Sequence, residues 1–515
     1  MSKSIAQAAV IIMIMNLASR LLGFGRETVI ASQFGATHLT DAYLVAYTLP
    51  YFLQAVLGMA LVSSIVPVIT RYLVKGEADT AWRIASITLN WTVLFMAVLT
   101  ALGMVGARAL VFATAPGFDE ATSDLATLLT IIMFPSVVFM GAGMLITGIL
   151  NARKSFAVAA FAPGFSSLII IFSVLFLGKL GISYLAWGTL VSFVGGFLIQ
   201  LPALRKVGFQ YKWDWSLNHP EVKGIFINLL PIFLGTAVNQ LYLAINRFFA
   251  SGLAEGSISA LNYSGKLMNL PMGIFVLAIS SAIFPTLSEH AVKDDREALA
   301  KTLLKGLKLV LLITIPAAAG LMALRVPVVK LLFERGAFDA TATQMTADAL
   351  FYFSLGMFAM AANMVITRAY YALRDVKTPL YLGLISIVVN IIVSIALVPR
   401  MGHSGLALAN TLASIFSYVT MYWFLSRHLP DLYLGSLLRT TGKAIGAAIL
   451  CALAAGITYS QLSILSQIQG TKGLLVVVAA GIFAGIVVFG LALLLFREEE
   501  TQELLGSFMR RIRRS

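Results

Sequence analysis

The sequence predicts an all-α polytopic membrane protein with 14 transmembrane helices, built as two parallel six-helix lobes plus two C-terminal helices. Three observations lead to this fold class. Hydrophobic residues make up 59% and charged residues 12% of the 515 residues, against roughly 45–50% and 25% in soluble domains. Apolar runs of about 20 residues recur along the whole chain. Several short motifs also recur at a spacing of about 220 residues.

Fourteen apolar segments, separated by polar or helix-breaking residues, are the predicted helices. Their ranges are 5–33, 41–72, 82–107, 122–150, 155–177, 181–204, 223–250, 258–288, 302–323, 342–372, 379–399, 403–427, 438–462 and 472–496. The first run follows Lys3 and resembles a signal peptide in length. It continues through Arg20 and Arg26 without a small-residue cleavage pattern, so we interpret it as a retained helix.

Lysine and arginine residues indicate the orientation of these helices in the membrane. If both termini are cytoplasmic, most basic residues lie in cytoplasmic loops, including the clusters within 71–83, 205–223, 293–308 and 510–514. An odd number of helices would destroy this alternation. The sequence therefore predicts cytoplasmic termini, with residues 501–515 as a basic cytoplasmic tail.

Composition and motifs exclude several classes of function. The net charge of +14 would suggest nucleic-acid binding in a soluble protein, but these charges flank membrane helices, so we expect no nucleic-acid partner. The single Cys451 excludes a disulfide framework and a cysteine zinc cluster. No phosphate-binding loop or H-E-x-x-H metal helix is present, and the loops are too short for a catalytic domain. We predict a transporter without cofactor, metal site or catalytic residues, not an enzyme.

An internal repeat divides the chain. Arg26 and Arg247 lie about 220 residues apart, as do Leu49-Pro50 and Leu270-Pro271. Six helices fit in one period, so both halves have the same orientation. We predict an N-lobe over 1–220 (helices 1–6), a C-lobe over 221–430 (helices 7–12) and helices 13 and 14 over 431–500. Parallel repeats are typical of transporters that pass substrate between their lobes.

Charged residues in the first helix are the strongest candidates for a functional site, because an ionisable group in hydrocarbon costs at least ~2.5–3.5 kcal/mol. This helix contains Arg20, Arg26 and Glu27. A straight helix would point the two arginines in different directions. Gly23 and Gly25 permit a hinge that would turn both guanidinium groups toward one water-filled cavity.

Other interpretations of these charges stay open. Arg26 could instead form an ion pair with Glu27 or Asp41 that only ties helices together. Arg247 lies near the end of its helix, where it either serves the cavity or snorkels to the interface. Lys266 stands mid-helix in a polar stripe, which favours a position facing protein or water.

The predicted cavity is cationic, because its basic residues outnumber its acidic ones. Guanidinium groups bind phosphate or diphosphate through paired hydrogen bonds, so an anionic substrate is favoured. A cation-coupled drug exporter would need membrane carboxylates, and only Glu27 and Asp41 are available. Asn390 and Ser394 could bind a coupling cation, but no carboxylate joins them and interhelical hydrogen bonding is favoured.

An ordered set of motifs over about residues 1 to 430 resembles one known family. It comprises Ser19-Arg20-Leu21-Leu22-Gly23-Phe24-Gly25-Arg26-Glu27, Phe34-Gly35-Ala36, Thr40-Asp41-Ala42-Tyr43, Leu49-Pro50, Ala115-Pro116-Gly117-Phe118, Leu150-Asn151-Ala152, Ala162-Pro163, Phe284-Pro285-Thr286-Leu287-Ser288, Arg335-Gly336-Ala337-Phe338 and Asp375-Val376-Lys377-Thr378-Pro379. In these motifs the chain is similar to the MurJ (MviN) lipid II flippases of the multidrug/oligosaccharidyl-lipid/polysaccharide (MOP) exporter superfamily.

The resemblance implies a V-shaped carrier in the bacterial cytoplasmic (inner) membrane. It would move lipid II, the undecaprenyl-diphosphate-linked peptidoglycan precursor, to the outer leaflet by alternating access. Positions matching Arg20, Arg26, Asp41 and Lys266 line the central cavity of such flippases, and Gln54 stands where some members have an arginine. Helices 13 and 14 would form a groove for the lipid tail.

The resemblance implies partners, and the predicted cationic cavity suggests an energy source. Lipid II, membrane lipids and the cell-wall synthesis machinery are the expected partners, and membrane potential or a monovalent cation would drive transport. Three alternatives stay open: a flippase for another polyprenyl-linked oligosaccharide, a cation-coupled multidrug exporter of the same fold, and a non-transporting scaffold for cell-wall enzymes.

Overall fold

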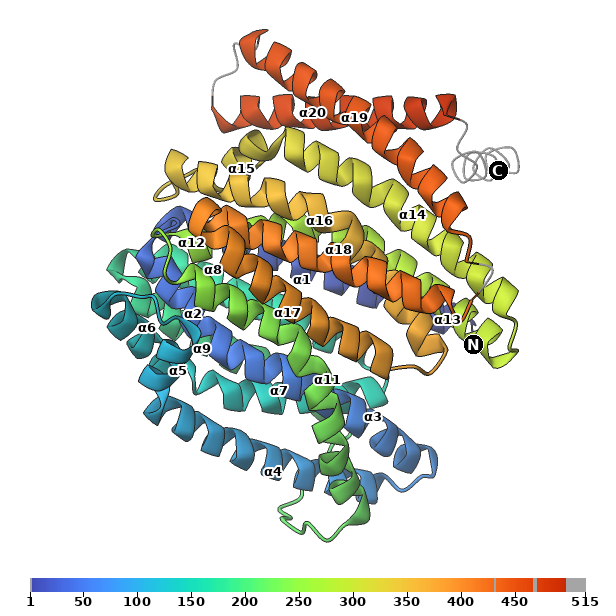
Figure 1. Cartoon of the computed structure of the whole chain (residues 1–515). Helices are drawn as coiled ribbons and strands as arrows, with labels where there is room; N and C mark the ends of the chain where they lie inside the picture. The colour runs from blue at the N-terminus through green and yellow to red at the C-terminus, as the bar shows by residue number, and fades with distance from the viewer. Residues whose placement is uncertain (1, 430–431, 466–469, 497–515) are drawn as a thin grey trace. The chain divides into compact units, whose positions relative to one another are not determined.

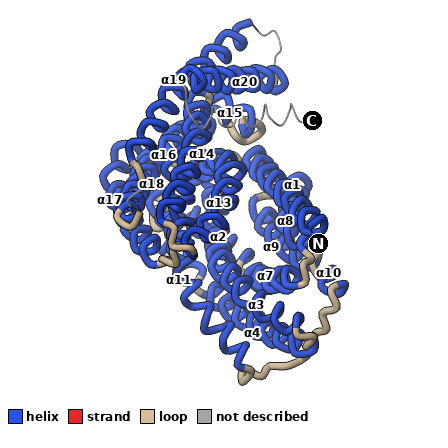
Figure 2. Tube along the Cα trace, turned by 90° about the vertical axis from the view of Figure 1, so that its right-hand side faces the viewer, coloured by secondary structure: helices blue, strands red, loops and turns tan. Residues whose placement is uncertain are grey.

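The structure, a computed structural model, describes residues 2–429, 432–465 and 470–496. Within these ranges the chain is helical and contains no strand (Figure 2). It divides into two compact units. Unit 1 extends over Met1–Ser259 and Arg335–Phe338, and unit 2 over Ala260–Glu334 and Asp339–Ser515. The predicted basic tail, 501–515, lies outside the described residues, and the predicted lobe boundaries stay predictions.

Unit 1 contains the elements up to α11 (Figure 1). They are α1 (Ser2–Phe34), α2 (His38–Leu53), the π-helical segment η1 (Gln54–Gly58), α3 (Met59–Val74), α4 (Ala78–Val105), α5 (Ala107–Thr114), α6 (Glu120–Met133), α7 (Ser136–Ala152), α8 (Phe156–Leu177), the 3₁₀ turn η2 (Gly178–Leu180), α9 (Ile182–Leu198), α10 (Leu201–Lys206) and α11 (Pro220–Ala250).

Unit 2 contains the later elements, and the first of them begins in the last residues of unit 1. They are α12 (Ser257–Pro271), the π-helical segment η3 (Met272–Val276), α13 (Leu277–Val292), α14 (Arg296–Ala323), α15 (Arg325–Phe333), α16 (Ala340–Ala372), α17 (Lys377–Met401), α18 (His403–Ser426), α19 (Leu434–Leu465) and α20 (Thr471–Leu495). Asp295 and Asp339 cap α14 and α16 by accepting hydrogen bonds from the backbone of Ala298 and Ala342.

The predicted membrane class is confirmed, and a helix or a run of helices occupies each of the 14 predicted ranges. Ten helical segments of the described residues are long and apolar enough to cross a membrane, and the bent pair α6–α7 would make eleven. The helices α1, α11 and α18 fill the remaining predicted ranges without meeting that criterion. The count of 14 spans therefore stays a prediction.

Two details of the predicted helices were wrong. The range 122–150 is not one helix, because α6 and α7 meet at an angle of 43° next to Pro135, whose ring nitrogen has no hydrogen to donate. The short helices α5 and α15, which follow α4 and α14, were not predicted. With eight and nine residues they are shorter than the hydropathy pattern of a span.

The internal repeat has a counterpart in local structure. In each half, a helix that contains a proline continues through a five-residue π-helical segment into another helix: Pro50 precedes η1, and Pro271 precedes η3. π-Helical segments are rare, occur mostly as single turns within α-helices and are frequent at functional sites. The recurring Leu-Pro pair therefore marks a recurring local backbone irregularity.

One face of α3 packs in the interior of unit 1 together with α4 and α7. Leu57, just before α3, and Leu61, Ile65 and Ile69 follow one another at four-residue spacing, and they pack with Ile149 of α7 in the same cluster. Lipid tails are as apolar as these side chains, so close packing rather than exclusion of water holds such helices together in a membrane.

In unit 2, α19 and α20 approach each other closely. A Cβ atom on Gly481 would lie 3.0 Å from the carbonyl oxygen of Ala455, and one on Gly485 would lie 3.0 Å from Cys451 Sγ. Small residues at such positions allow membrane helices to pack tightly. Large apolar side chains on the same pair, including Ile457 and Phe483, remain exposed.

Candidate functional site

An ion pair lies in α1. Arg26 Nη2 is 2.6 Å from Glu27 Oε1, and these side chains are only 17% and 8% exposed. A charge-assisted hydrogen bond of this length is strong in a site shielded from water. Of the two acidic partners considered for Arg26, the structure therefore selects Glu27.

The predicted hinge lies within an unbroken helix. α1 continues through Gly23 and Gly25 and packs against α8. A Cβ atom on Gly23 would lie 3.9 Å from Ser167 Oγ, and one on Gly25 would lie 4.0 Å from Ile171 Cδ1. The glycines therefore face a helix contact in this conformation, and bending at this point stays a prediction.

Three tyrosines of α2 form a stack beside this ion pair. The ring centroids of Tyr43 and Tyr47 are 6.0 Å apart, and those of Tyr47 and Tyr51 are 5.7 Å apart. Tyr43 and Tyr47 both act electrostatically on the Arg26 guanidinium group. Sequence reasoning missed this group, although the spacing of four residues places the three rings on one helix face.

Asp41 is fully engaged with the first turn of α12. Its carboxylate accepts hydrogen bonds from the backbone nitrogen of Gly256 at 2.9 Å, the backbone nitrogen of Ser259 at 2.8 Å and Ser259 Oγ at 2.5 Å. These nitrogens have no partner within the helix, and the positive end of the helix dipole favours an anion there. Asp41 thus caps a helix about 220 residues distant in sequence.

Arg247 does not snorkel. Its residue is only 5% exposed, and Nη1 donates a hydrogen bond to the carbonyl oxygen of Ile258 at 3.0 Å. Its Nε has no hydrogen-bond partner in the described part of the chain. Asp41 and Glu27 are the acidic groups that act on it electrostatically. The snorkelling interpretation was therefore wrong, because the buried guanidinium group binds the start of α12 instead of reaching the interface.

Unit 1 thus brings together four of the predicted site residues: Arg26, Glu27, Asp41 and Arg247. With two arginines and two carboxylates, this group has no net charge. The sequence predicted a cationic cavity, so the balance within this group was not expected. Buried charges persist only when they are paired or hydrogen-bonded, and each of these four has at least one polar partner.

The other predicted residues lie apart from this group or in unit 2. Arg20 is exposed on α1, and Gln54 is half-buried at the first position of η1. Lys266 is half-buried in the middle of α12, within unit 2. No cluster of three or more His, Cys, Asp or Glu side chains able to hold a metal occurs in the described residues.

The loop before α12 is attached to the start of α2. Glu255 Oε1 accepts hydrogen bonds from the backbone nitrogen of His38 at 2.9 Å and lies 2.8 Å from its ring Nδ1. The hydrogen bond from the His38 backbone, and then the one from its ring, hold the pKa of Glu255 below its usual range. Nearby, Ser251 Oγ accepts a hydrogen bond from the backbone nitrogen of Gly117 at 3.0 Å.

Comparison with known proteins places the chain in a family. A family model described as lipid II flippase MurJ matches residues 30–481. The chain belongs to the MurJ family. One MurJ relative, the lipid II flippase MurJ of Burkholderia cenocepacia, is 32% identical over 452 residues, which are 85% of this chain and 87% of the relative. A probable lipid II flippase MurJ of Vibrio cholerae is 30% identical over 448 residues, 84% of each chain.

Solved structures agree with membership of the MurJ family. A lipid II flippase MurJ in an inward closed conformation matches with a TM-score of 0.79 and 25% identity, over 96% of this chain and 100% of that chain. An inward-facing MATE multidrug transporter of the MOP superfamily matches with a TM-score of 0.68 over 82% of this chain and 98% of its own, at 16% identity, and shares the fold alone. The predicted MurJ family is confirmed.

Proposed function

We propose that this MurJ family member moves lipid II from the inner to the outer leaflet of the bacterial cytoplasmic membrane by alternating access. Membership of the family over residues 30–481 supports the proposal most directly, because relatives named lipid II flippases match 84–85% of the chain. The process makes and breaks no covalent bond, so the protein is a transporter and not an enzyme.

The chemistry of Arg26 fits such a substrate. The diphosphate of lipid II offers oxygen acceptors of the same kind as the Glu27 carboxylate, so it can take over the guanidinium group that Glu27 holds at 2.6 Å. Tyr43 and Tyr47 lie near the same guanidinium group and act on it electrostatically. Binding of the anionic head group would offset repulsion among basic residues and favour closure around it.

The energy source in this proposal is the membrane potential. With the cell interior negative, outward movement of an anion is favoured by ~2.3 kcal/mol per charge per 100 mV. No bound cofactor is required, and a monovalent cation is the alternative source. Both termini are placed in the cytoplasm, following the distribution of basic residues.

The lipid tail and protein partners complete the proposal. The exposed apolar side chains of α19 and α20, such as Ile457 and Phe483, suit an undecaprenyl chain that stays in the lipid phase. The cell-wall synthesis machinery, which consumes lipid II at the outer leaflet, is the expected protein partner. Co-purification of those enzymes with the full chain from membranes tests this expectation.

The proposal is tested in cells depleted of their own lipid II flippase and complemented with the wild-type chain, Arg26→Ala or Arg108→Ala. Arg108 is the matched control, because its side chain is 73% exposed and its partner Asp124 is 3.7 Å distant. We expect the wild type and Arg108→Ala to restore accessible lipid II in the outer leaflet. Arg26→Ala should fail although it reaches the membrane in equal amount.

Other outcomes identify the alternatives. Failure of the wild type, with export of another polyprenyl-linked oligosaccharide, would favour that substrate instead. Cation-dependent efflux of drugs would favour a multidrug exporter. Normal growth with Arg26→Ala, at full complex formation with cell-wall enzymes, would favour a scaffold.

A further inference from the structure

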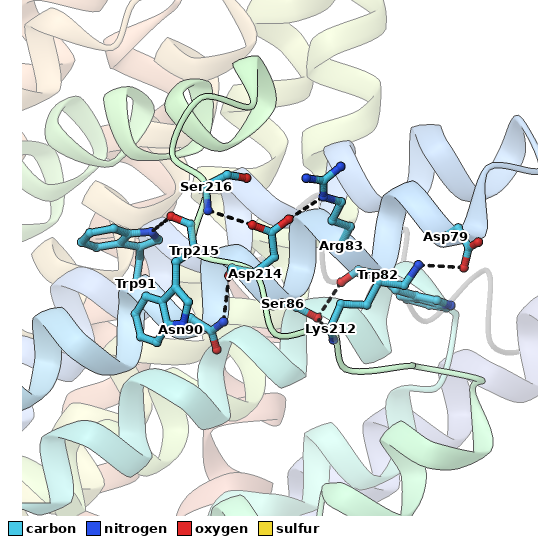
Figure 3. A network of polar contacts seen from close by, with 10 residues as sticks. All are labelled: Asp79, Trp82, Arg83, Ser86, Asn90, Trp91, Lys212, Asp214, Trp215 and Ser216. Carbon is cyan, nitrogen blue, oxygen red and sulfur yellow. Dashed lines mark hydrogen bonds and ion pairs between the residues drawn. The ribbon is translucent and has the colours of Figure 1, made fainter.

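The connection between α10 and α11 is an extended segment with alternating chemistry. Residues 209–216, here called the strap, read Phe-Gln-Tyr-Lys-Trp-Asp-Trp-Ser. Aromatic residues occupy the odd positions and polar residues the even ones. In an extended chain, successive side chains point to opposite sides. The strap lies along α4, and Figure 3 shows the polar contacts that hold it there.

The polar side of the strap is bound to α4. Lys212 Nζ lies 3.0 Å from Asp79 Oδ1, and its backbone nitrogen donates to Ser86 Oγ at 3.0 Å. Asp214 Oδ2 accepts a hydrogen bond from Arg83 Nε at 2.5 Å. These side chains therefore face the helix and satisfy its polar residues (Figure 3).

Two side chains of α4 also bind the strap backbone. Asn90 Nδ2 donates to the carbonyl oxygen of Asp214 at 2.9 Å, and Trp91 Nε1 donates to that of Trp215 at 3.1 Å. The contacts thus extend over residues 79–91 of α4, near the beginning of a candidate membrane span, Ala78–Val105. Without the strap, this polar stripe of α4 would lack these partners.

The aromatic rings of the strap are partly exposed, although Tyr211 Oη donates a hydrogen bond to Asn90 Oδ1 of α4 at 2.7 Å and the Trp215 ring lies edge-on against Trp91 of α4. Tyr211, Trp213 and Trp215 are 48%, 78% and 38% exposed. Their rings form a connected row, with centroids 6.4 Å apart between Tyr211 and Trp213 and 5.7 Å apart between Trp213 and Trp215. A segment surrounded by water would place its polar residues outward. Here Trp213, the most exposed of the three rings, faces outward instead.

We propose that the strap is an anchor that binds the lipid headgroup region of the inner leaflet through Tyr211, Trp213 and Trp215. Tyrosine and tryptophan favour this region because each combines an apolar ring with a polar group. The exposed Arg205 and Lys206, at the end of the preceding helix, suit anionic lipids. The leaflet follows from the orientation proposed above, whereas the lipid contact itself does not depend on the flippase function.

Depth measurement on the full chain in lipid nanodiscs tests the anchor. In a Cys451→Ser background, Trp213→Cys and, as matched control, Gln210→Cys are labelled with the same small fluorophore. Gln210 is exposed on the same strap but outside the aromatic row. Quenchers are nitroxides near the lipid headgroup, nitroxides at the end of the acyl chain, and iodide in water.

We expect the headgroup nitroxide to quench position 213 several-fold more strongly than the chain-end nitroxide does, with little quenching by iodide. Position 210 should respond mainly to iodide. Asp214→Ala, which removes the acceptor of Arg83, should release the strap and lower lipid quenching at 213 several-fold. If the Cys substitution disturbs folding, quenching of intrinsic emission by brominated lipids, compared between wild type and Trp213→Phe, provides the same information.

Two results would overturn the proposal. Equal quenching of positions 213 and 210 by iodide, without lipid quenching, would place the strap in water. Protection of position 213 from all three quenchers would show that protein covers the aromatic row, either a second copy of the chain or another segment of it.

Discussion

At the residue scale, each buried charge of unit 1 has a polar partner nearby. Arg26 has Glu27 as partner, Asp41 has the first turn of α12, and Arg247 has the Ile258 carbonyl oxygen. Taking a charge out of water costs several kcal/mol, which only paired groups recover. A substrate anion that enters this group must therefore compete with bonds that already exist.

A double substitution separates the two roles of Arg26. If Arg26 serves only to neutralise Glu27, then Arg26→Ala combined with Glu27→Gln leaves no unpaired charge and should restore activity. We expect the opposite: the double variant stays inactive because the diphosphate has lost its guanidinium group, while Glu27→Gln alone remains active. The measurement is outer-leaflet lipid II in complemented cells, and recovery in the double variant would contradict a substrate contact.

The pKa of Asp214 determines how we expect the strap to respond to pH. The backbone nitrogen of Ser216, followed by Arg83, lowers the pKa of Asp214 to about 2. Because the pKa is lowered, the ionised Asp214 carboxylate stabilises the folded state fully at pH values above its unfolded-state pKa of 3.8. This stabilisation is lost as the pH falls through about 2. We therefore expect the emission of a label at position 213 to be constant from pH 8 down to about 5. A transition within that range would show that another group holds the strap.

At the element scale, the beginning of α12 depends on a tight turn. Gly256 has φ +82°, and a Cβ atom there would lie 2.2 Å from the carbonyl oxygen of Ala36. The turn lets the Gly256 backbone nitrogen reach Asp41. Backbone conformation and close approach therefore both require glycine at this position.

Gly208 allows these two requirements to be separated. It has φ +84° but open space around a Cβ atom. Gly208→Ala should cost about 1–2 kcal/mol for the positive φ alone. Gly256→Ala should cost about 1–3 kcal/mol more, because Ala36 must move. Unfolding of the purified variants in mixed micelles measures both values, and equal losses would show that the contact with Ala36 relaxes without cost.

At the scale of the whole molecule, the distribution of charge determines orientation and direction. Basic residues concentrate in the loops predicted to be cytoplasmic, and the potential acts on any charge that crosses the membrane. A carrier of an anionic head group should therefore respond to the sign of the potential.

Proteoliposomes with imposed potentials measure that response. We expect flipping of lipid II toward the positive side to accelerate and the reverse movement to slow, since each charge contributes ~2.3 kcal/mol per 100 mV. The control variant Arg108→Ala should respond as the wild type does. Rates that do not depend on the sign of the potential would point to a coupling cation or to electroneutral movement.

What the sequence determined by itself is local or compositional. Apolar runs set the helices because backbone groups in lipid must bond within the segment, and ordered motifs such as Ser19 to Glu27 identified the family. The sequence did not predict the angle at Pro135 or the helices α5 and α15, because a hydropathy pattern averages over such short features.

Only the tertiary structure decided which groups meet. From sequence spacing, Arg26 could pair with either of two acidic residues, and Arg247 could lie either in the cavity or at the interface. The tyrosine stack beside α1 was not predicted. The capping of α12 by Asp41 joins residues far apart in sequence, as do the contacts of the strap with α4. Such pairings depend on how helices pack, because a buried polar group finds its partner in space and not along the chain.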